Sequence, residues 1–180
     1  MNKLSGFTLI ELIVVMALIM ILSVVGIGTY TQATVKGKDT QRKSDLNQIA
    51  KAVESFYTDV GRYPLSEDGE TNPLCYDDSA ADKNAPCTSE DLTATIDGQE
   101  TSYINIPEDP IPSQYYVYVS DSKGTKYWLY TALESQTDRD LLENVDGSIY
   151  EYSVNCGSGV PCNYQLTEIG LNKIIPTPSP

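Results

Sequence analysis

The sequence predicts an α+β protein in which one long N-terminal α-helix packs on a small antiparallel β-sheet head. Three observations support this fold class: an apolar run opens the chain, an amphipathic helical pattern follows it, and tyrosine-rich segments with strand character fill part of the second half. The length of 180 residues leaves enough chain for one small core after the helix. We therefore expect a helix that is apolar all round at first and has one buried face later.

The first 28 residues have an apolar run with a single acid in it. A short polar leader that carries Lys3 ends at Gly6, the helix is expected to begin at Phe7, and the acid is Glu11. The apolar stretch of about 22 residues is long enough to cross a hydrocarbon core of ~30 Å. We therefore expect a transmembrane helix over residues 7–28. An ionisable side chain inside such a segment marks a functional pairing by default.

The partner of Glu11 is expected to come from a neighbouring copy of the chain. Cleavage after Gly6 would give Phe7 a protonated α-amino group, about 6 Å along the helix axis from Glu11. Two such groups on neighbouring helices could neutralise each other in a low-dielectric bundle. Two alternatives stay open, a chance acid near a membrane interface and an ordinary secretory signal peptide. The acid within the apolar region counts against the signal peptide.

The run Gly6-Phe7-Thr8-Leu9-Ile10-Glu11 and the apolar residues after it resemble the class III signal of type IV prepilins and type II secretion pseudopilins. This resemblance implies the type IV pilin fold and a leader of residues 1–6 that a membrane prepilin peptidase and methyltransferase removes. Phe7 would then be N-methylated, and the helices would pack into a filament. It also implies a single-pass inner-membrane precursor with an extracytoplasmic head, in contact with lipid and assembly machinery before it reaches a pilus or pseudopilus.

The next segment, residues 29–61, predicts the amphipathic half of the same helix. Gly61 is a suitable C-terminal stop, with Pro64 three residues later. Apolar residues recur at spacings of three and four and form one face: Leu46, Ile49, Ala50, Val53, Tyr57 and Val60. Most charged residues are expected away from that face: Lys36, Lys38, Arg42, Lys43, Lys51 and Glu54.

The end of this helix carries a second resemblance. The residues 42–49, followed by Arg62-Tyr63-Pro64, are similar to the helix end of the major pseudopilin of type II secretion. The acid-proline pair and the tyrosines of that family are echoed in Asp109-Pro110 and in residues 115–118. The likeness extends in patches to about residue 134.

The head is expected to span residues 62–175, with a disordered tail over 176–180. Residues 65–113 predict a disulfide-stapled loop with little regular structure, which resembles the variable surface loop of pilins. Strands are expected over 114–120 and 126–134, joined by a turn at 121–124, over 148–154, and over 164–167. In the second strand, Leu129, Thr131 and Leu133 would share one face, with Trp128, Tyr130 and Ala132 on the other.

The four cysteines all lie in the head, as two close pairs. An exported head would place them in an oxidising space, where disulfides persist. Three connectivities are open, and the local one, which joins Cys75 to Cys87 and Cys156 to Cys162, is favoured. A metal site is disfavoured, because the chain has no histidine and no CxxC spacing.

Charge excludes one class of partner. Residues 1–58 carry six Lys or Arg and four Asp or Glu, so residues 59–180 carry six and twenty-one, a net −15. Such a head should repel nucleic acid, so we expect no direct nucleic-acid binding. We expect no cofactor. A cation site at Asp77, Asp78 and Asp82 is weighed as the weaker alternative to a solvated acidic loop. For residues 137–147, the resemblance to major pseudopilins suggests a calcium loop, but the spacing does not match an EF-hand loop.

Catalysis is not expected either. The absence of histidine removes the common nucleophile–base arrangements, and no pair of carboxylates lies in an apolar context. We therefore predict a structural filament subunit and no enzyme. The alternative is a membrane-anchored extracytoplasmic binding domain that does not polymerise. The sequence leaves open pilus or pseudopilus, major or minor subunit, and a role in adhesion, motility, DNA uptake or secretion.

Overall fold

The computed structural model describes residues 6–66, 72–87, 91–171 and 173, and for residues 24–29 it describes the backbone only. The leader residue Lys3 and the tail over 176–180 thus lie outside the described residues. The chain divides into two compact units, Met1–Gly37 and Lys38–Pro180. The elements along the chain are α1 (Leu9–Val60), β1 (Cys75–Asp77), β2 (Asn84–Ala85), β3 (Asp91–Ile96), β4 (Gln99–Asn105), β5 (Val117–Ser120), β6 (Tyr127–Thr131), β7 (Tyr164–Thr167) and β8 (Gly170–Leu171).

The first unit contains the start of α1. Large apolar side chains between Phe7 and Leu22 are 48% to 88% exposed, on all sides of the helix. We expected residues 7–28 to cross a membrane, but the side chains of residues 24–28 lie outside the described part. Within the part that is described, no helix combines the length and the hydropathy that a bilayer span requires.

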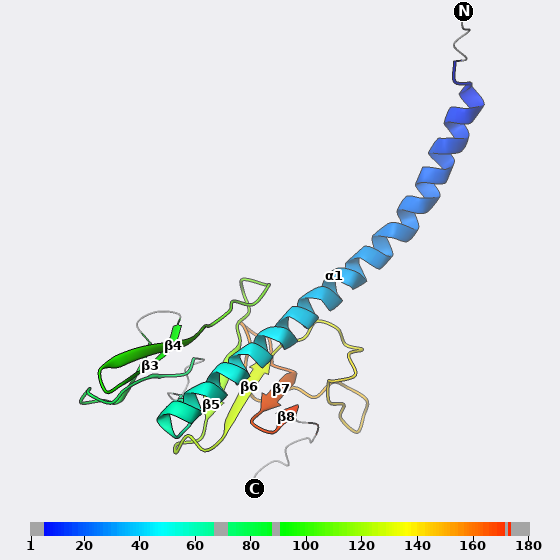
Figure 1. Ribbon diagram of the computed structural model, residues 1–180. Helices are drawn as coiled ribbons and strands as arrows, with labels where there is room; N and C mark the ends of the chain where they lie inside the picture. Colours follow the sequence, from blue (N-terminus) through cyan, green and yellow to red (C-terminus); the bar gives the residue numbers. More distant parts are fainter. Residues whose placement is uncertain (1–5, 67–71, 88–90, 172, 174–180) are drawn as a thin grey trace, which may run out of the picture. The chain divides into compact units, whose positions relative to one another are not determined.

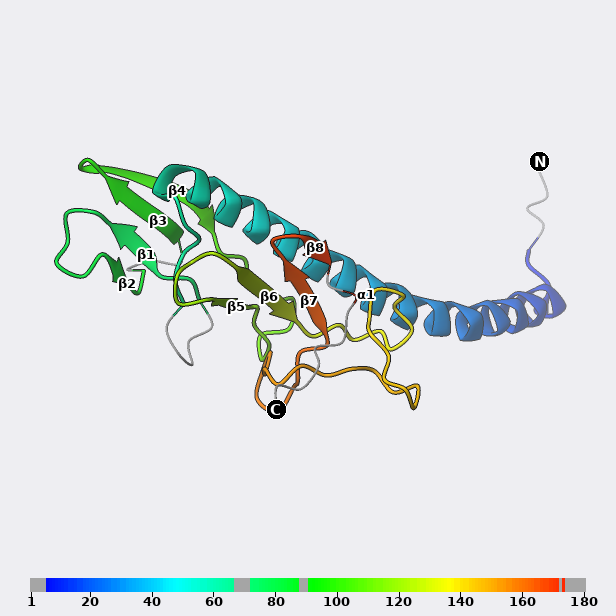
Figure 2. The same cartoon turned by 90° about the horizontal axis from the view of Figure 1, so that it is seen from below.

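In the second unit, one face of α1 is buried, as the apolar spacing predicts. Leu46, Ile49, Val53 and Phe56 are at most 2% exposed and belong to a core cluster with side chains from β3, β5, β6 and β7. Figures 1 and 2 show the end of α1 lying along both sheets. Tyr57, which we assigned to this face, is instead 42% exposed.

The helix ends where the sequence indicates. Gly61 takes a left-handed conformation with φ 81°, and its N–H donates to the carbonyl of Tyr57 at 2.8 Å. Glycine adopts this conformation without the steric cost of a Cβ, which is why it commonly closes helices.

One sheet has the antiparallel order β5-β6-β7-β8. The predicted hairpin and the last predicted strand are confirmed, although β5 and β6 are shorter than the expected ranges. The strand predicted over 148–154 is wrong, because that segment forms only an isolated bridge between Glu143 and Ile149. Its alternating side chains serve instead to cover the sheet, where Tyr152 packs on Tyr130 at 5.3 Å between ring centroids.

Both faces of this sheet are buried. Leu129 and Leu133 lie in the cluster under α1, whereas Tyr130 and Ala132 lie in a second cluster with Cys156 and Cys162. The predicted division of β6 into two faces is therefore confirmed for these residues. The segment that carries the second disulfide covers the face away from the helix.

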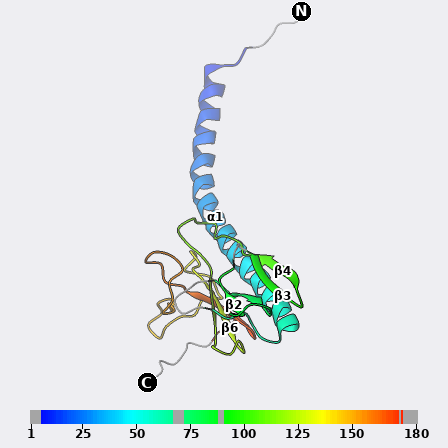
Figure 3. The same ribbon diagram turned by 90° about the vertical axis from the view of Figure 1, so that its left-hand side faces the viewer.

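The segment expected to be an irregular loop contains a second sheet, of order β2-β1-β3-β4. Figure 3 shows β3 and β4 beside the C-terminal end of α1. The sequence signal was Asp97-Gly98, which joins β3 to β4 with φ of 52° and 76°. Two adjacent residues with positive φ suit the two-residue hairpin turn that Asp-Gly favours. The prediction of little regular structure is thus wrong for residues 91–105.

Candidate functional site

Gly6 and Phe7, the expected processing residues, are open to solvent. Apart from Gly6 and its two chain neighbours, no described residue has an atom within 4 Å of the position that a Cβ on Gly6 would occupy, and Phe7 is 88% exposed. The peptide bond between them is therefore sterically accessible in the chain as the structure describes it.

Glu11 has a partner within its own chain that the sequence analysis missed. The N–H and the Oγ1 hydroxyl of Thr8 both donate to Glu11 Oε2 at 2.8 Å, and the Glu11 N–H donates to Thr8 Oγ1 at 3.3 Å. This is a reciprocal capping box at the start of α1, and the Thr-x-x-Glu pattern is its sequence signal. The carboxylate is thereby directed to the N-terminal end of the helix, beside the residue whose nitrogen cleavage would release.

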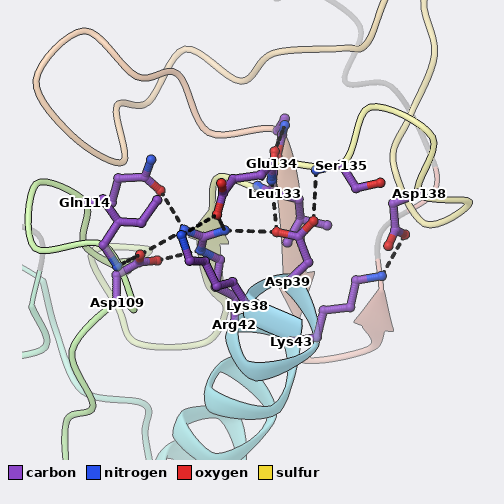
Figure 4. A network of polar contacts seen from close by, with 12 residues as sticks. Lys38, Asp39, Arg42, Lys43, Asp109, Gln114, Leu133, Glu134, Ser135 and Asp138 are labelled. Carbon is purple, nitrogen blue, oxygen red and sulfur yellow. Dashed lines mark hydrogen bonds and ion pairs between the residues drawn. The ribbon is translucent and has the colours of Figure 1, made fainter. Parts of the chain in front are cut away.

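A second site lies at the start of the helix in the second unit, where Arg42 is fully buried. Its Nε and Nη2 atoms contact the two carboxylate oxygens of Asp109 at 2.8 and 3.0 Å. Nη1 contacts Asp39 at 2.9 Å and Glu134 at 3.0 Å, and Nη2 also donates to Gln114 at 3.2 Å. Figure 4 shows the guanidinium enclosed between these side chains.

Electrostatics keep this arginine charged. Burial acts to lower the pKa of Arg42, but the hydrogen bonds and charge of Asp109, together with the hydrogen bonds to Glu134 and Asp39, raise it above its usual value. A buried charge is tolerated when it is paired and fully hydrogen-bonded. The prediction that Arg42 lies away from the buried face is therefore wrong.

The spacing did contain a signal for Arg42. It precedes Leu46, Ile49, Val53 and Phe56 by steps of four, three, four and three, so it lies on the apolar stripe itself. An arginine on that stripe requires an acidic partner from elsewhere in the chain. Asp109, from the acid-proline pair noted in the sequence, fulfils that role 67 residues away.

Asp39 links the same helical turn to the chain beyond β6. Its carboxylate oxygens accept the N–H groups of Glu134 and Ser135, each at 2.9 Å, in addition to the contact with Arg42 (Figure 4). The Arg42 network, defined as Asp39, Arg42, Asp109, Gln114 and Glu134, thus joins α1 to the segments before β5 and after β6.

The acids considered for calcium have other contacts. Asp138 and Asp140 bind Lys43 Nζ at 2.7 and 2.8 Å, while Asp78 accepts the N–H of Asp97 at 2.9 Å. Among the described residues, no three His, Cys, Asp or Glu are grouped to hold a metal ion.

The cysteines pair locally. Cys75 is bonded to Cys87 and Cys156 to Cys162, with Cα–Cα distances of 5.0 and 5.1 Å. The first bond joins β1 to the segment after β2, and the second closes the loop over the outer face of β6. Each disulfide therefore links two segments within the second unit.

Comparison with known proteins identifies the N-terminal segment. Residues 1–27 match the family model for the prokaryotic N-terminal methylation motif. The chain is similar to the type IV major pilin protein PilA of Myxococcus xanthus (strain DK1622), with 36% identity over 58 residues, which are 32% of this chain and 26% of that protein. The match thus spans about a quarter of the relative's length. No solved structure matches the chain.

Proposed function

We propose that this chain, which belongs with the type IV pilins and pseudopilins by its methylation motif and its likeness to a major pilin, is a filament subunit. In this proposal, prepilin peptidase cuts between Gly6 and Phe7, and Phe7 is N-methylated. The mature chain then polymerises through the start of α1. The observation that carries the proposal is an apolar helical segment, exposed on all sides, whose one acid is held at its N-terminal end.

The physical driving force follows from the two environments of this segment. A precursor in lipid already has its apolar side chains shielded from water, so transfer into a bundle of copies gains little from the hydrophobic effect. Close packing and polar pairing must therefore favour the filament. An ion pair between Glu11 and the Phe7 amine of a neighbouring copy supplies such a pairing, because a carboxylate in a low-dielectric bundle is costly without a partner.

The Thr8–Glu11 capping box supports this role. By holding the carboxylate at the helix start, it reduces the conformational freedom that the side chain loses on pairing. If two neighbouring helices are offset by about one turn, the Phe7 amine of one copy would lie beside the Glu11 carboxylate of the other.

The remaining features of the subunit follow from this assembly. The precursor would be an inner-membrane protein, and its acidic head would be displayed outward from the filament. The helix end and Asp109-Pro110 favour a secretion pseudopilus, whereas the two disulfides and the elaborated head favour a surface pilus. Electron micrographs of cells would distinguish them, since surface fibres labelled by antibodies to the head are expected only for a pilus.

The mass of the mature N-terminus tests the proposal. A chain that begins with methylated Phe7 is the expected result, and Gly6→Arg should leave unprocessed protein in the membrane. A mature chain that still begins with Met1 would instead favour a membrane-anchored binding domain that does not polymerise.

A further inference from the structure

The apolar contacts between α1 and the sheet do not define how far along the helix the β5–β6 hairpin lies. Leu46, Ile49, Val53 and Phe56 repeat along one stripe of the helix, and apolar attraction is non-directional. A shift of the hairpin by one helical turn, about 5.4 Å, would replace one apolar set by another. Directional contacts are therefore needed to select a single register.

Directional contacts occur at both ends of this hairpin. At its turn, the Tyr63 N–H donates to the carbonyl of Gly124 at 2.9 Å. At its open end, Arg42 binds Asp109, on the chain that leads into β5. One helical turn earlier, Asp39 accepts two N–H groups from the chain that leaves β6.

We infer that Arg42 is a positioning residue which, with Asp39, fixes the register of the β5–β6 hairpin, and with it the head, along α1. This inference rests on the proposed function for its consequence in assembly. Since α1 is one continuous helix from Leu9 to Val60, a slipped head would alter the contacts between heads of neighbouring subunits.

The planar guanidinium is suited to this task. Its two parallel bonds to Asp109 define both distance and orientation, which a lysine ammonium cannot do. The hydrogen bonds from Arg42 Nη1 to Asp39 and Glu134 further restrict the position of the guanidinium. Arg42 therefore binds both the segment that leads into β5 and the segment that leaves β6 from one point on the helix.

The principal test variant is Arg42→Met combined with Asp109→Asn, which removes both charges of the bidentate pair. Removal of Arg42 alone would leave Asp109 as an uncompensated buried charge. Asp39 also loses its ion pair with Arg42 in the double variant but keeps the two backbone N–H donors of Glu134 and Ser135. Amide hydrogen exchange of the full chain in detergent is the first readout, and filament yield in the native host is the second. Arg42→Lys is a further variant, which keeps the charge and loses the fork.

The amide of Tyr63 is the informative reporter, because it lies just beyond Val60, the end of α1, and Val60 is about 27 Å from Arg42 along the helix at ~1.5 Å per residue. We expect at least tenfold faster amide exchange at Tyr63, Glu134 and Ser135 in the double variant. The amides that form the ladder hydrogen bonds between strands β6 and β7 should exchange at the wild-type rate. Filament yield should fall at least tenfold, with Phe7 still processed. Arg42→Lys should give intermediate values.

Lys43→Gln is the matched control. It lies beside Arg42 and removes two ion pairs, with Asp138 and Asp140, together with the contact of its ammonium with the Tyr164 ring of β7. The bonds of Arg42 and Asp39 to the segments that flank the hairpin stay intact in this control. Wild-type exchange at Tyr63 and wild-type yield are expected. The inference is overturned if a folded double variant keeps wild-type protection at Tyr63, and its link to assembly is refuted if yield is unchanged. If the wild-type chain forms no filaments, the proposed function fails instead.

Discussion

Gly124 lies so close to Tyr63 that a side chain does not fit between them. A Cβ built on Gly124 would be 2.6 Å from the carbonyl oxygen of Tyr63, and Gly124 has a φ of 64°. The turn between β5 and β6 thus contacts the segment just beyond the end of α1 through the backbone itself.

Gly124→Ala should therefore destabilise the head by about 2–4 kcal/mol, the sum of left-handed strain and a backbone clash. Gly147→Ala is the control, because Gly147 also has positive φ (82°) but no atom within 4 Å of its Cβ position. It should cost only about 1–2 kcal/mol. Thermal unfolding of the full chain in detergent measures both, and equal costs would contradict the close contact.

The second disulfide should hold the loop that covers the face of the sheet away from α1. Cys156 and Cys162 are fully buried there, and Trp128, the sole tryptophan of the chain, packs against their cluster. Replacing both cysteines by serine should cost about 2–3 kcal/mol for a loop of this length and shift the Trp128 emission to the red. The same change at Cys75 and Cys87 should leave the emission unchanged. An unaltered spectrum in the first variant would show that the disulfide does not hold this cover in place.

Alkaline pH should weaken the contact between the helix end and the sheet. Burial, followed by the hydrogen bond to Glu54, raises the pKa of Tyr63 to about 12. The unfolded chain therefore loses this proton near its ordinary pKa of about 10, before the folded chain does. The stability that Tyr63 contributes is complete below pH 10 and decreases as the pH rises towards 12.

Tyr63→Phe should reduce the slope of stability against pH between 10 and 12, as measured by denaturant unfolding of the full chain. The matched control is Tyr115→Phe, at a tyrosine that is 41% exposed, and it should preserve the slope. A slope that is identical in wild type and Tyr63→Phe would contradict the assignment.

Elements that are determined by residues close together in the sequence could be predicted from the sequence. The glycine at position 61 predicted the end of α1, and the turn at 121–124 predicted the β5–β6 hairpin. Asp97-Gly98 is also a local hairpin signal, but the polar composition around it favours a loop, which is why the β3–β4 hairpin is not predicted. The segment 148–154 has strand-like alternation because its side chains pack on the sheet. Periodicity alone does not distinguish a segment that packs on a sheet from a strand that pairs with a neighbouring strand.

The capping box of Thr8 and Glu11 and the Arg42 network also differ in how far apart in the sequence their residues lie. Thr8 and Glu11 are three residues apart, so the capping box could have been identified from the sequence. The burial of Arg42 depends on Asp109 and Glu134, which are 67 and 92 residues away. Periodicity places Arg42 on the buried stripe, but only the tertiary structure supplies the acids that make its burial tolerable.

Glu11→Ala tests the central claim most directly, when filament yield is measured together with the N-terminal mass of the membrane-bound chain. Thr8→Val serves as the control, since it keeps the backbone N–H that binds Glu11 and should reduce yield far less. We predict that Glu11→Ala is inserted, cleaved and methylated at Phe7 but gives at least tenfold fewer filaments. Filaments at the wild-type yield from this variant would contradict the pairing of Glu11 with a neighbour's amine.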